Sequence, residues 1–379
     1  MSWSERSLDQ LGFVSRGRSR HRPRDAAHLY GGQYPFVQTG DVKHAGLYLT
    51  DYSQTYSEEG LAQSKLWPVG TLCITIAANI ADTSILAIDA CFPDSVIGFI
   101  PDPEKADARF VKYLFDAVLK LQYRQFTQGA AQDNLSQAKL LALKFLVPDD
   151  VTEQTRIADF IATYDDLIEN NRRRIQLLEE SARLLYQEWF VHLRFPGHEQ
   201  VKITGGVPEG WSKEPLENLL ILQRGFDLPL SNRIEGNVPI YASTGINGFH
   251  NVAKVKAPGV VTGRSGSLGT VMYVAKDFWP LNTTLWVKEF KRASPIFATF
   301  LLRTMKLEGY NGGAAVPTLN RNDVHKVDVL CPTNKLMSEF ELQVEDVFKQ
   351  VDKLKEYNEK LAQARDLLLP KLMSGELAV

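Results

Sequence analysis

The amino-acid sequence contains two related copies of one long segment, and this repeat constrains the fold more than any other feature. Residues 3–17 and 211–225 both begin with Trp-Ser, continue through Leu-Asp/Glu-x-Leu and end with Arg-Gly, at a constant offset of 208. A repeat near 190 residues is too long for a solenoid and predicts a duplicated domain. Later matches have smaller offsets because the second copy is shorter: 187 for Phe92-Pro93 with Trp279-Pro280, and 184 for Pro148 with Pro332.

Composition limits the class of protein. A chain of 379 residues, 44% of them hydrophobic, can form two domains with substantial cores. The net charge of −2 leaves room only for a local basic patch, not for a global basic field. We find no signal-peptide pattern and no run of 18 apolar residues, so we expect a cytoplasmic protein without a membrane span. Three widely separated cysteines fit a reducing compartment and argue against a disulfide framework or zinc cluster: Cys73, Cys91 and Cys331.

The pattern of short apolar runs and turns predicts a mixed α/β domain in each copy. In the first copy we expect a helix near 107–122 and strands near 34–37, 72–77, 84–88 and 95–100. In the second copy we expect a helix near 294–307 and strands near 237–242, 259–263, 270–275 and 283–289. The expected fold class is therefore α+β, with two mixed domains and an internal pseudo-twofold repeat.

Each copy is followed by a long stretch in which apolar residues recur with the 4-3 spacing of a coiled-coil seam. The first seam contains Ile157, Ile161, Tyr164, Ile168, Asn171, Ile175, Leu178 and Leu185. The second contains Val344, Val347, Val351, Leu354, Asn358, Leu361 and Leu368. Each seam carries one Asn, the residue type that fixes register, and Pro370 should kink or end the second helix.

The simplest partner for one of these helices is the other. A helix of about 33 residues is ~50 Å long, and an antiparallel pair would hold one globular copy at each end. The segments predicted from these patterns are the first domain at 1–150, its helix at 151–192, a Gly/Pro-rich linker at 193–210, the second domain at 211–333 and its helix at 334–379.

Motifs for catalysis are missing. The sequence has no amino-methyltransferase tetrapeptide, no Walker loop, no His-Glu-x-x-His and no paired Cys-x-x-Cys, and none of its seven histidines has metal-ligand spacing. We therefore expect no catalytic residue, no metal site and no cofactor in this chain. The Gly-rich run 263–269 lies between two expected strands, so it is either a tight turn or a loop whose N–H groups meet phosphate.

Candidate DNA contacts come from a dense basic run and from polar loop residues at matched places in the two copies. Arg and Lys suit phosphate, and Gln, Asn and Arg suit base edges, although a solvated loop and ordinary turn chemistry remain the alternatives. The basic run contains Arg16, Arg18, Arg20, Arg22 and Arg24. The other candidates are Gln38, Thr39, Asn79, Gln132 and Asn134 in the first copy, and Arg224, Ser243, Thr244, Arg264, Ser265, Ser267, Thr318 and Asn320 in the second.

Several stretches together resemble the specificity subunits of type I restriction–modification enzymes. The most specific are DDLIENNRRRI at 165–175, the segment from Leu178 to Gly197, and the ending LLLPKLMSGEL at 367–377. Residues 74–80, 92–98 and 263–269 resemble stretches in the target recognition domains of that family.

The resemblance implies that two target recognition domains each read one half of a bipartite DNA site and that antiparallel helices set their separation. It further implies that two modification subunits dock on the helices and supply S-adenosylmethionine-dependent adenine N6 methylation. Restriction subunits can join with ATP and Mg²⁺, and this chain itself would be non-catalytic. The alternatives are the same architecture serving a type II or fused methyltransferase–nuclease, a self-contained methyltransferase, or a structural adaptor without a DNA role.

Overall fold

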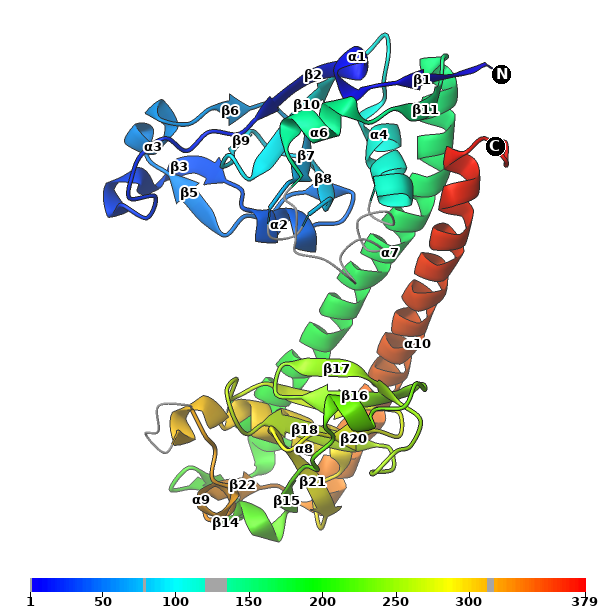
Figure 1. Cartoon of the computed structure of the whole chain (residues 1–379). Coiled ribbons are helices and arrows are strands. Elements are labelled where there is room, and N and C mark those ends of the chain that lie inside the picture. Colours follow the sequence, from blue (N-terminus) through cyan, green and yellow to red (C-terminus); the bar gives the residue numbers. More distant parts are fainter. Residues whose placement is uncertain (1, 78–79, 120–134, 312–316) are drawn as a thin grey trace. The chain divides into compact units, whose positions relative to one another are not determined.

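The computed structural model describes residues 2–77, 80–119, 135–311 and 317–379. The chain divides into two compact units, each holding one copy of the repeat and part of both long helices (Figure 1). The first unit comprises Met1–Arg172 with Glu356–Val379, and the second comprises Arg173–Lys355. None of the helices in the described part of the chain combines the length and apolarity that a membrane crossing requires.

The first copy is built on two sheets and a helical layer. One sheet has the order β2 (Gly12–Arg16), β10 (Val96–Pro101), β7 (Leu72–Thr75), β8 (Thr83–Leu86) and β4 (Tyr48–Leu49). The other has the order β5 (Gln54–Tyr56), β3 (Tyr30–Phe36), β9 (Ala90–Cys91) and β6 (Leu66–Trp67). A short pair, β1 (Trp3–Arg6) with β11 (Phe145–Pro148), and the helices α1 (Leu8–Leu11), α2 (Thr39–His44), α3 (Glu58–Ala62), α4 (Ala108–Leu114) and α6 (Gln137–Ala142) complete it.

Strand β7 shows why this copy folds around its first sheet. Its residues are buried on both faces, because successive side chains of a strand point in opposite directions. Leu72 and Ile74 pack in the cluster that includes Phe110 of α4, whereas Cys73 packs in the cluster that includes Trp67 of the second sheet. An unbroken apolar strand of this kind therefore lies between a helical layer and a second sheet.

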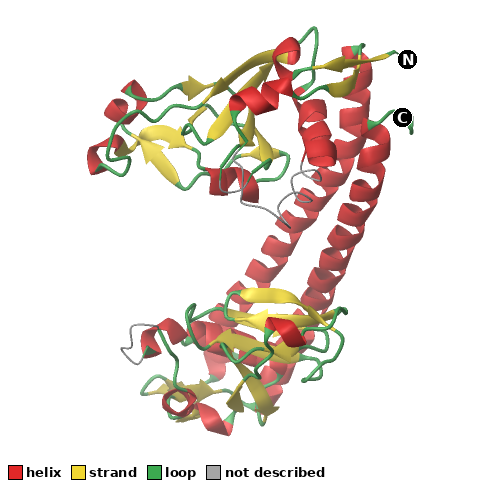
Figure 2. Cartoon of the chain, viewed as in Figure 1, coloured by secondary structure: helices red, strands yellow, loops and turns green. Residues whose placement is uncertain are grey.

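The second copy keeps the strand order of both sheets, but its sheets have four and three strands because β4 and β6 have no counterpart strands; Figure 2 shows helices and strands in both copies. Its main sheet is β15 (Leu220–Arg224), β21 (Thr284–Phe290), β18 (Gly259–Gly263) and β19 (Val271–Val274). Beside it lie β17 (Gly245–His250), β16 (Val238–Ala242) and β20 (Trp279–Pro280), the pair β14 (Ser212–Pro215) with β22 (Asp328–Cys331), and the helices α8 (Pro295–Thr304) and α9 (Arg321–His325). The predicted α+β class and internal repeat are confirmed.

Strand register refines the repeat. Ser4 pairs with Val147 and Ser212 pairs with Cys331, which reproduces the offsets of 208 and 184. In the middle of the copy, however, the backbone gives an offset one larger than the 187 of the Phe92-Pro93 match, because Arg18 N–H donates to Phe92 O and its counterpart Phe226 N–H donates to Pro280 O. Arg16 pairs with Ile97, and Arg224 pairs with Leu285, so β10 and β21 are offset by 188. The sequence match relied on an aromatic residue followed by proline, whereas backbone hydrogen bonds fix the register.

The Arg-Gly ending shared by the two copies has a packing reason. A Cβ on Gly17 would lie 2.4 Å from the carbonyl oxygen of Phe92, and one on Gly225 would lie 2.2 Å from that of Leu281. Both distances are shorter than any tolerated contact. Each glycine also donates its N–H across the sheet, to Val96 O at 2.8 Å and to Thr284 O at 3.1 Å.

The long helices are α7 (Val151–Tyr186) and α10 (Asn334–Met373). In the first unit the beginning of α7 lies beside the end of α10 (Figure 1), and in the second unit Ile175 of α7 packs with Val351 and Leu354 of α10, so the helices run antiparallel. The buried seam residues are Ile157, Ile161, Ile168, Ile175, Val344, Val351 and Leu354. The others are half-buried: Tyr164, Asn171, Leu178, Leu185, Val347, Asn358, Leu361 and Leu368.

Three details differ from the sequence-based expectations. Helix α10 passes through Pro370 and ends three residues later, at Met373. The expected helix at 107–122 changes to a π-helix over Phe115–Leu119 within the described residues. The Gly/Pro-rich linker contains a strand pair that the sequence did not predict, β12 (Ile203–Thr204) with β13 (Val207–Pro208).

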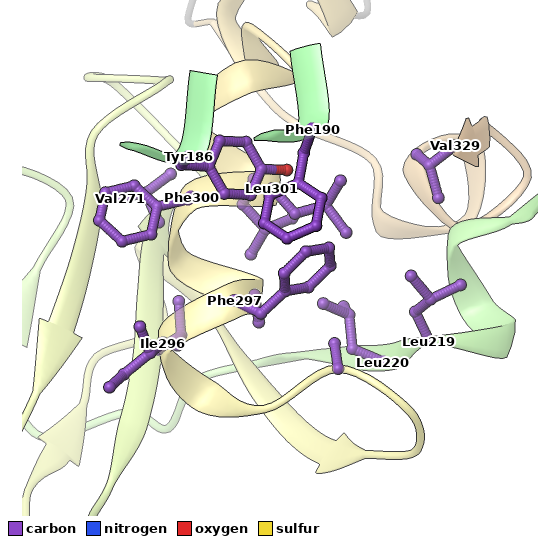
Figure 3. Packing of buried hydrophobic residues seen from close by; sticks show 14 of the residues in the cluster. Tyr186, Phe190, Leu219, Leu220, Val271, Ile296, Phe297, Phe300, Leu301 and Val329 are labelled. Atoms are coloured by element: carbon purple, nitrogen blue, oxygen red, sulfur yellow. The ribbon is translucent and has the colours of Figure 1, made fainter. Parts of the chain in front are cut away.

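The core of the second unit joins the helix end to the second copy through aromatic packing (Figure 3). The ring of Tyr186 stacks on Phe300 with centroids 5.4 Å apart, and Phe190 meets Phe297 edge-on at 5.1 Å. Edge-on and offset rings of this kind stabilise a core beyond the area that they bury. Burial also raises the pKa of the Tyr186 hydroxyl.

Candidate nucleic-acid interface

The loop that carries the basic run is fixed to the body of the first copy. The side-chain oxygen Oε1 of Gln63 accepts the backbone N–H groups of Arg20 at 2.6 Å and His21 at 3.0 Å. The Ser64 hydroxyl donates to Arg18 O at 2.7 Å, and Arg18 N–H donates to the Phe92 carbonyl at 3.0 Å. Because its backbone is held from both sides, the loop presents its side chains from a defined surface.

Three of the five arginines are engaged within the protein. Arg16 donates Nε and Nη2 to the Asp94 carbonyl oxygen, at 2.8 and 2.5 Å, and Arg24 Nη2 lies 2.9 Å from both carboxylate oxygens of Asp94. Arg22 turns back onto its own loop and donates Nη1 to the carbonyl of Ser19 at 2.8 Å. These three side chains help to shape the loop.

Arg18 and Arg20 differ from the other three. Both are exposed, and neither guanidinium has an ion-pair or hydrogen-bond partner in the part of the chain that the structure describes. Beside them, the Lys65 ammonium lies 3.7 Å from the ring centroid of Trp67. Burial, reinforced by the nearby Arg18 charge, lowers the pKa of Lys65. Repulsion between like charges of this kind indicates a locally positive surface that an anion would relieve.

The sequence analysis missed one exposed polar residue of the first copy, Gln54, which is bonded to the predicted candidate Gln38. Gln38 precedes α2 and donates its backbone N–H to Asp41 Oδ2 at 2.7 Å, while its Nε2 donates to Gln54 Oε1 at 2.6 Å. Thr39 is the first residue of α2 and is half-buried. Gln38 is thus committed to contacts inside the protein, and the exposed amide at this place belongs to Gln54. No sequence signal marked Gln54, because its link to Gln38 spans the whole of α2 and β4.

The Gly-rich loop of the second copy is a turn whose N–H groups serve the fold. Gly263 donates its N–H to Thr270 O at 3.2 Å, and Arg264 and Ser265 donate theirs to Thr283 O at 2.8 and 3.1 Å. Gly266 N–H donates to Pro317 O at 3.1 Å. Four successive donors are therefore consumed, which favours the turn over a loop that cradles phosphate.

The same contacts bring several predicted residues of the second copy together. Ser265 and Thr318 form an antiparallel β-bridge, and Leu319 N–H donates to Arg264 O at 2.8 Å. Ser243 lies against Gly263, because a Cβ added to Gly263 would be 3.3 Å from the Cβ of Ser243. The hairpin tip, the Gly-rich loop and the segment before α9 thus share one surface of the second unit.

Exposure separates these candidates. Arg224, Thr244, Ser267 and Asn320 are exposed, and Arg264, Ser265 and Thr318 are half-buried. Ser243 keeps only 9% of its surface exposed, so it is poorly placed to meet DNA. Asn320 also caps α9, since its side-chain oxygen accepts the Asn322 N–H at 3.1 Å. Asn79, Gln132 and Asn134 lie outside the described residues.

Comparison with known proteins finds similarity to specificity subunits of type I restriction–modification systems. Residues 2–180 match the model of the type I restriction modification DNA specificity domain. The MjaIX specificity subunit of Methanocaldococcus jannaschii is 22% identical, covering 100% of this chain and 94% of the relative. The HindI specificity subunit of Haemophilus influenzae is 21% identical over 99% of both chains. The S subunit of a type I restriction–modification system from M. genitalium has the same fold, with a TM-score of 0.57, 17% identity, and coverage of 98% of this chain and 96% of that one.

The duplicated α+β domains and the paired helices have the fold of that S subunit. The chain is similar over nearly its whole length to specificity subunits of type I restriction enzymes, and its residues 2–180 match the specificity domain of that family. Within the described residues, no group of three or more His, Cys, Asp or Glu side chains is placed to hold a metal ion.

Proposed function

We propose that this chain reads DNA for a type I restriction–modification complex, with each globular copy reading one half of a bipartite target. The observation that carries the proposal is the duplication itself. The two copies share the order of their common strands, and Arg16 pairs with Ile97 as Arg224 pairs with Leu285, but the copies differ in the loops that present polar side chains. One scaffold with two different loop sets suits one DNA target with two different half-sites.

The loops differ where recognition would occur. In the first copy, Phe36 of β3 pairs with Gln54 of β5 across a connection that contains α2 and β4. In the second copy, Ala242 pairs with Gly245, so only Ser243 and Thr244 connect the strands. The first copy also has the dense arginine loop, of which the second retains Arg224. Unequal loops support an asymmetric target.

Phosphate contacts would position the first copy on the duplex. Arg18 and Arg20 project from a fixed loop next to Lys65, without partners among the described residues. Cations of this kind add affinity that does not depend on sequence, and contacts to base edges add specificity.

The long helices would set the distance between the half-sites and bind two modification subunits. Each carries exposed apolar residues outside the seam, and those of α7 occur in pairs seven residues apart, as one partner helix would require. They are Phe160, Leu167, Leu177 and Leu184 on α7, and Leu342 and Leu367 on α10. This chain would contribute no catalytic group: the modification subunits would supply S-adenosylmethionine-dependent adenine N6 methylation, and restriction subunits would add ATP- and Mg²⁺-dependent activity.

The test is to co-express the chain with the modification subunit encoded beside it and to map methylated adenines by single-molecule sequencing. We expect one bipartite motif with a fixed spacer. Exchange of residues 1–150 for those of a relative should change one half-site and leave the other intact. A stable complex that methylates no bipartite motif would contradict the proposal and favour the same architecture serving a type II or fused methyltransferase–nuclease.

A further inference from the structure

The connection between β3 and β5 of the first copy ends in an exposed amide that is held in place. Gln54 opens β5, and its Oε1 accepts a hydrogen bond of 2.6 Å from Gln38 Nε2. Gln38 is fixed in turn, because its N–H donates to Asp41 Oδ2, which also accepts the hydroxyl of Ser53 at 3.1 Å. Gln38, which is held by Asp41, therefore orients the Gln54 amide across the segment that contains α2 and β4.

This arrangement turns the Gln54 oxygen toward Gln38 and leaves both of its N–H groups to offer. Its acceptor atom is engaged by Gln38, whereas its Nε2 carries two N–H groups and has no partner in the described part of the chain. The residue is exposed. An amide that offers its two N–H groups recognises acceptors. In the major groove, guanine (O6 and N7) and thymine (O4) present acceptors without an amino donor, whereas adenine presents an amino donor beside its N7.

The amide lies at the edge of a hollow that can admit the edge of a base. Gln54 lines an open space of about 310 Å³ together with Tyr30, Gly31, Tyr52, Ser53 and Thr55. The Tyr30 hydroxyl donates to the Arg24 carbonyl at 2.7 Å, so the hollow borders the arginine loop. The Gln54 amide and the Arg24 end of the arginine loop thus border the same hollow.

We propose that Gln54 reads one base of the target half-site recognised by the first copy, and that Gln38 is the positioning residue that aims it. The inference rests on the proposed function and names a residue for it. The base read is one that presents acceptors, guanine or thymine. The second copy has no equivalent, because the two-residue turn of Ser243 and Thr244 replaces the whole inserted connection.

The decisive variant is Gln54→Glu in the full complex with modification subunits. A carboxylate still accepts the hydrogen bond from Gln38, but it offers the DNA an acceptor in place of two donors. We expect the preference at one position of one half-site to move from guanine or thymine toward cytosine or adenine, whose amino groups donate. Gln54→Ala should make that position degenerate, with a loss of discrimination of roughly 5- to 150-fold.

Two further variants separate reading from positioning. Gln38→Ala should weaken discrimination at the same position, and by less than Gln54→Ala, because the Gln54 amide remains but is no longer aimed. Gln33→Ala is the matched control, since Gln33 lies exposed on β3 and its amide donates to the Tyr34 hydroxyl at 3.2 Å. It should leave the motif unchanged.

The readout is the methylated motif, together with competition binding by duplexes that differ at single positions and a thermal melt of each complex. A change confined to one position supports the inference. An unchanged motif in both Gln54 variants, or a change spread over both halves, overturns it while the bipartite wild-type motif still stands. Absence of a bipartite motif in the wild type would instead count against the proposed function. For a variant that assembles but does not methylate, competition binding still measures the base preference at that position.

Discussion

Asn171 and Asn358 meet across the pair of long helices: Asn171 Nδ2 donates to Asn358 Oδ1 at 2.9 Å, and Asn358 Nδ2 donates to the Ile168 carbonyl at 3.3 Å. Each is the single asparagine of its seam, and both are half-buried. An Asn in an otherwise apolar seam favours the register in which its hydrogen bonds are made, at some loss of stability. The two seams are therefore aligned by a polar contact and stabilised by their apolar neighbours.

Substitution of this pair should separate stability from alignment. Asn171→Ala should lower the free energy of unfolding by about 1 kcal/mol, because it leaves half-buried polar atoms of Asn358 unsatisfied. Replacing both residues with Leu should raise the melting temperature instead. Denaturant unfolding measures both effects. The control is Arg172→Ala, which removes an exposed ion pair (Arg172 Nη1 to Glu169 Oε2, 3.6 Å) that should contribute little to the free energy of unfolding. A neutral Asn171→Ala would show that the contact contributes nothing.

Stability of the second unit should fall in mild acid through His325. Its Nε2 accepts the Leu222 N–H at 2.9 Å, which requires the neutral imidazole, and burial lowers its pKa. A histidine with a lowered folded pKa contributes stability above its unfolded value, about 6.5, and this contribution is lost as the pH falls.

The measurement is the free energy of unfolding between pH 7.5 and pH 5.5. Replacement of His325 by Gln should reduce the slope of this free energy against pH by at most about 1.4 kcal/mol per pH unit. The exposed His192, replaced in the same way, is the control and should leave the slope unchanged. Equal slopes in the wild type and in His325→Gln would show that this imidazole does not control acid stability.

The arginine loop should divide into residues that contact DNA and residues that shape the loop. Arg18→Ala and Arg20→Ala should each weaken binding to all sequences and reduce the dependence of log K on log salt by about one. Arg24→Ala should change the salt dependence less, because that guanidinium is paired with Asp94 at 2.9 Å. Fluorescence anisotropy at several salt concentrations measures both. A larger change in slope for Arg24→Ala than for Arg18→Ala would reverse this division.

Docking of modification subunits should depend on the exposed apolar residues of α7. Leu167→Asp and Leu177→Asp should each weaken assembly at least tenfold, because each would bury an unpaired charge in the interface. Leu230→Asp is the matched control: Leu230 is 78% exposed but lies outside the long helices. Analytical ultracentrifugation of mixtures gives the assembly constants. Equal effects of all three substitutions would place the interface elsewhere.

The sequence by itself determined the duplication, the α+β class, the two long helices and the positions of Asn171 and Asn358 in their seams. These features follow from local periodicity and from direct repetition, which need no knowledge of distant contacts. Even so, the match of Phe92-Pro93 with Trp279-Pro280 was wrong by one residue, because backbone hydrogen bonds make Pro280 the counterpart of Phe92.

Only the tertiary structure decided which candidate side chains are available to a ligand. Asp94 engages Arg16 and Arg24 across 78 and 70 residues of sequence and leaves Arg18 and Arg20 exposed. Gln38 is engaged by Gln54, and the N–H groups of the Gly-rich loop are engaged by the carbonyls of Thr270, Thr283 and Pro317. A side chain's residue type is local information, whereas its free donors and acceptors depend on what the fold brings beside it.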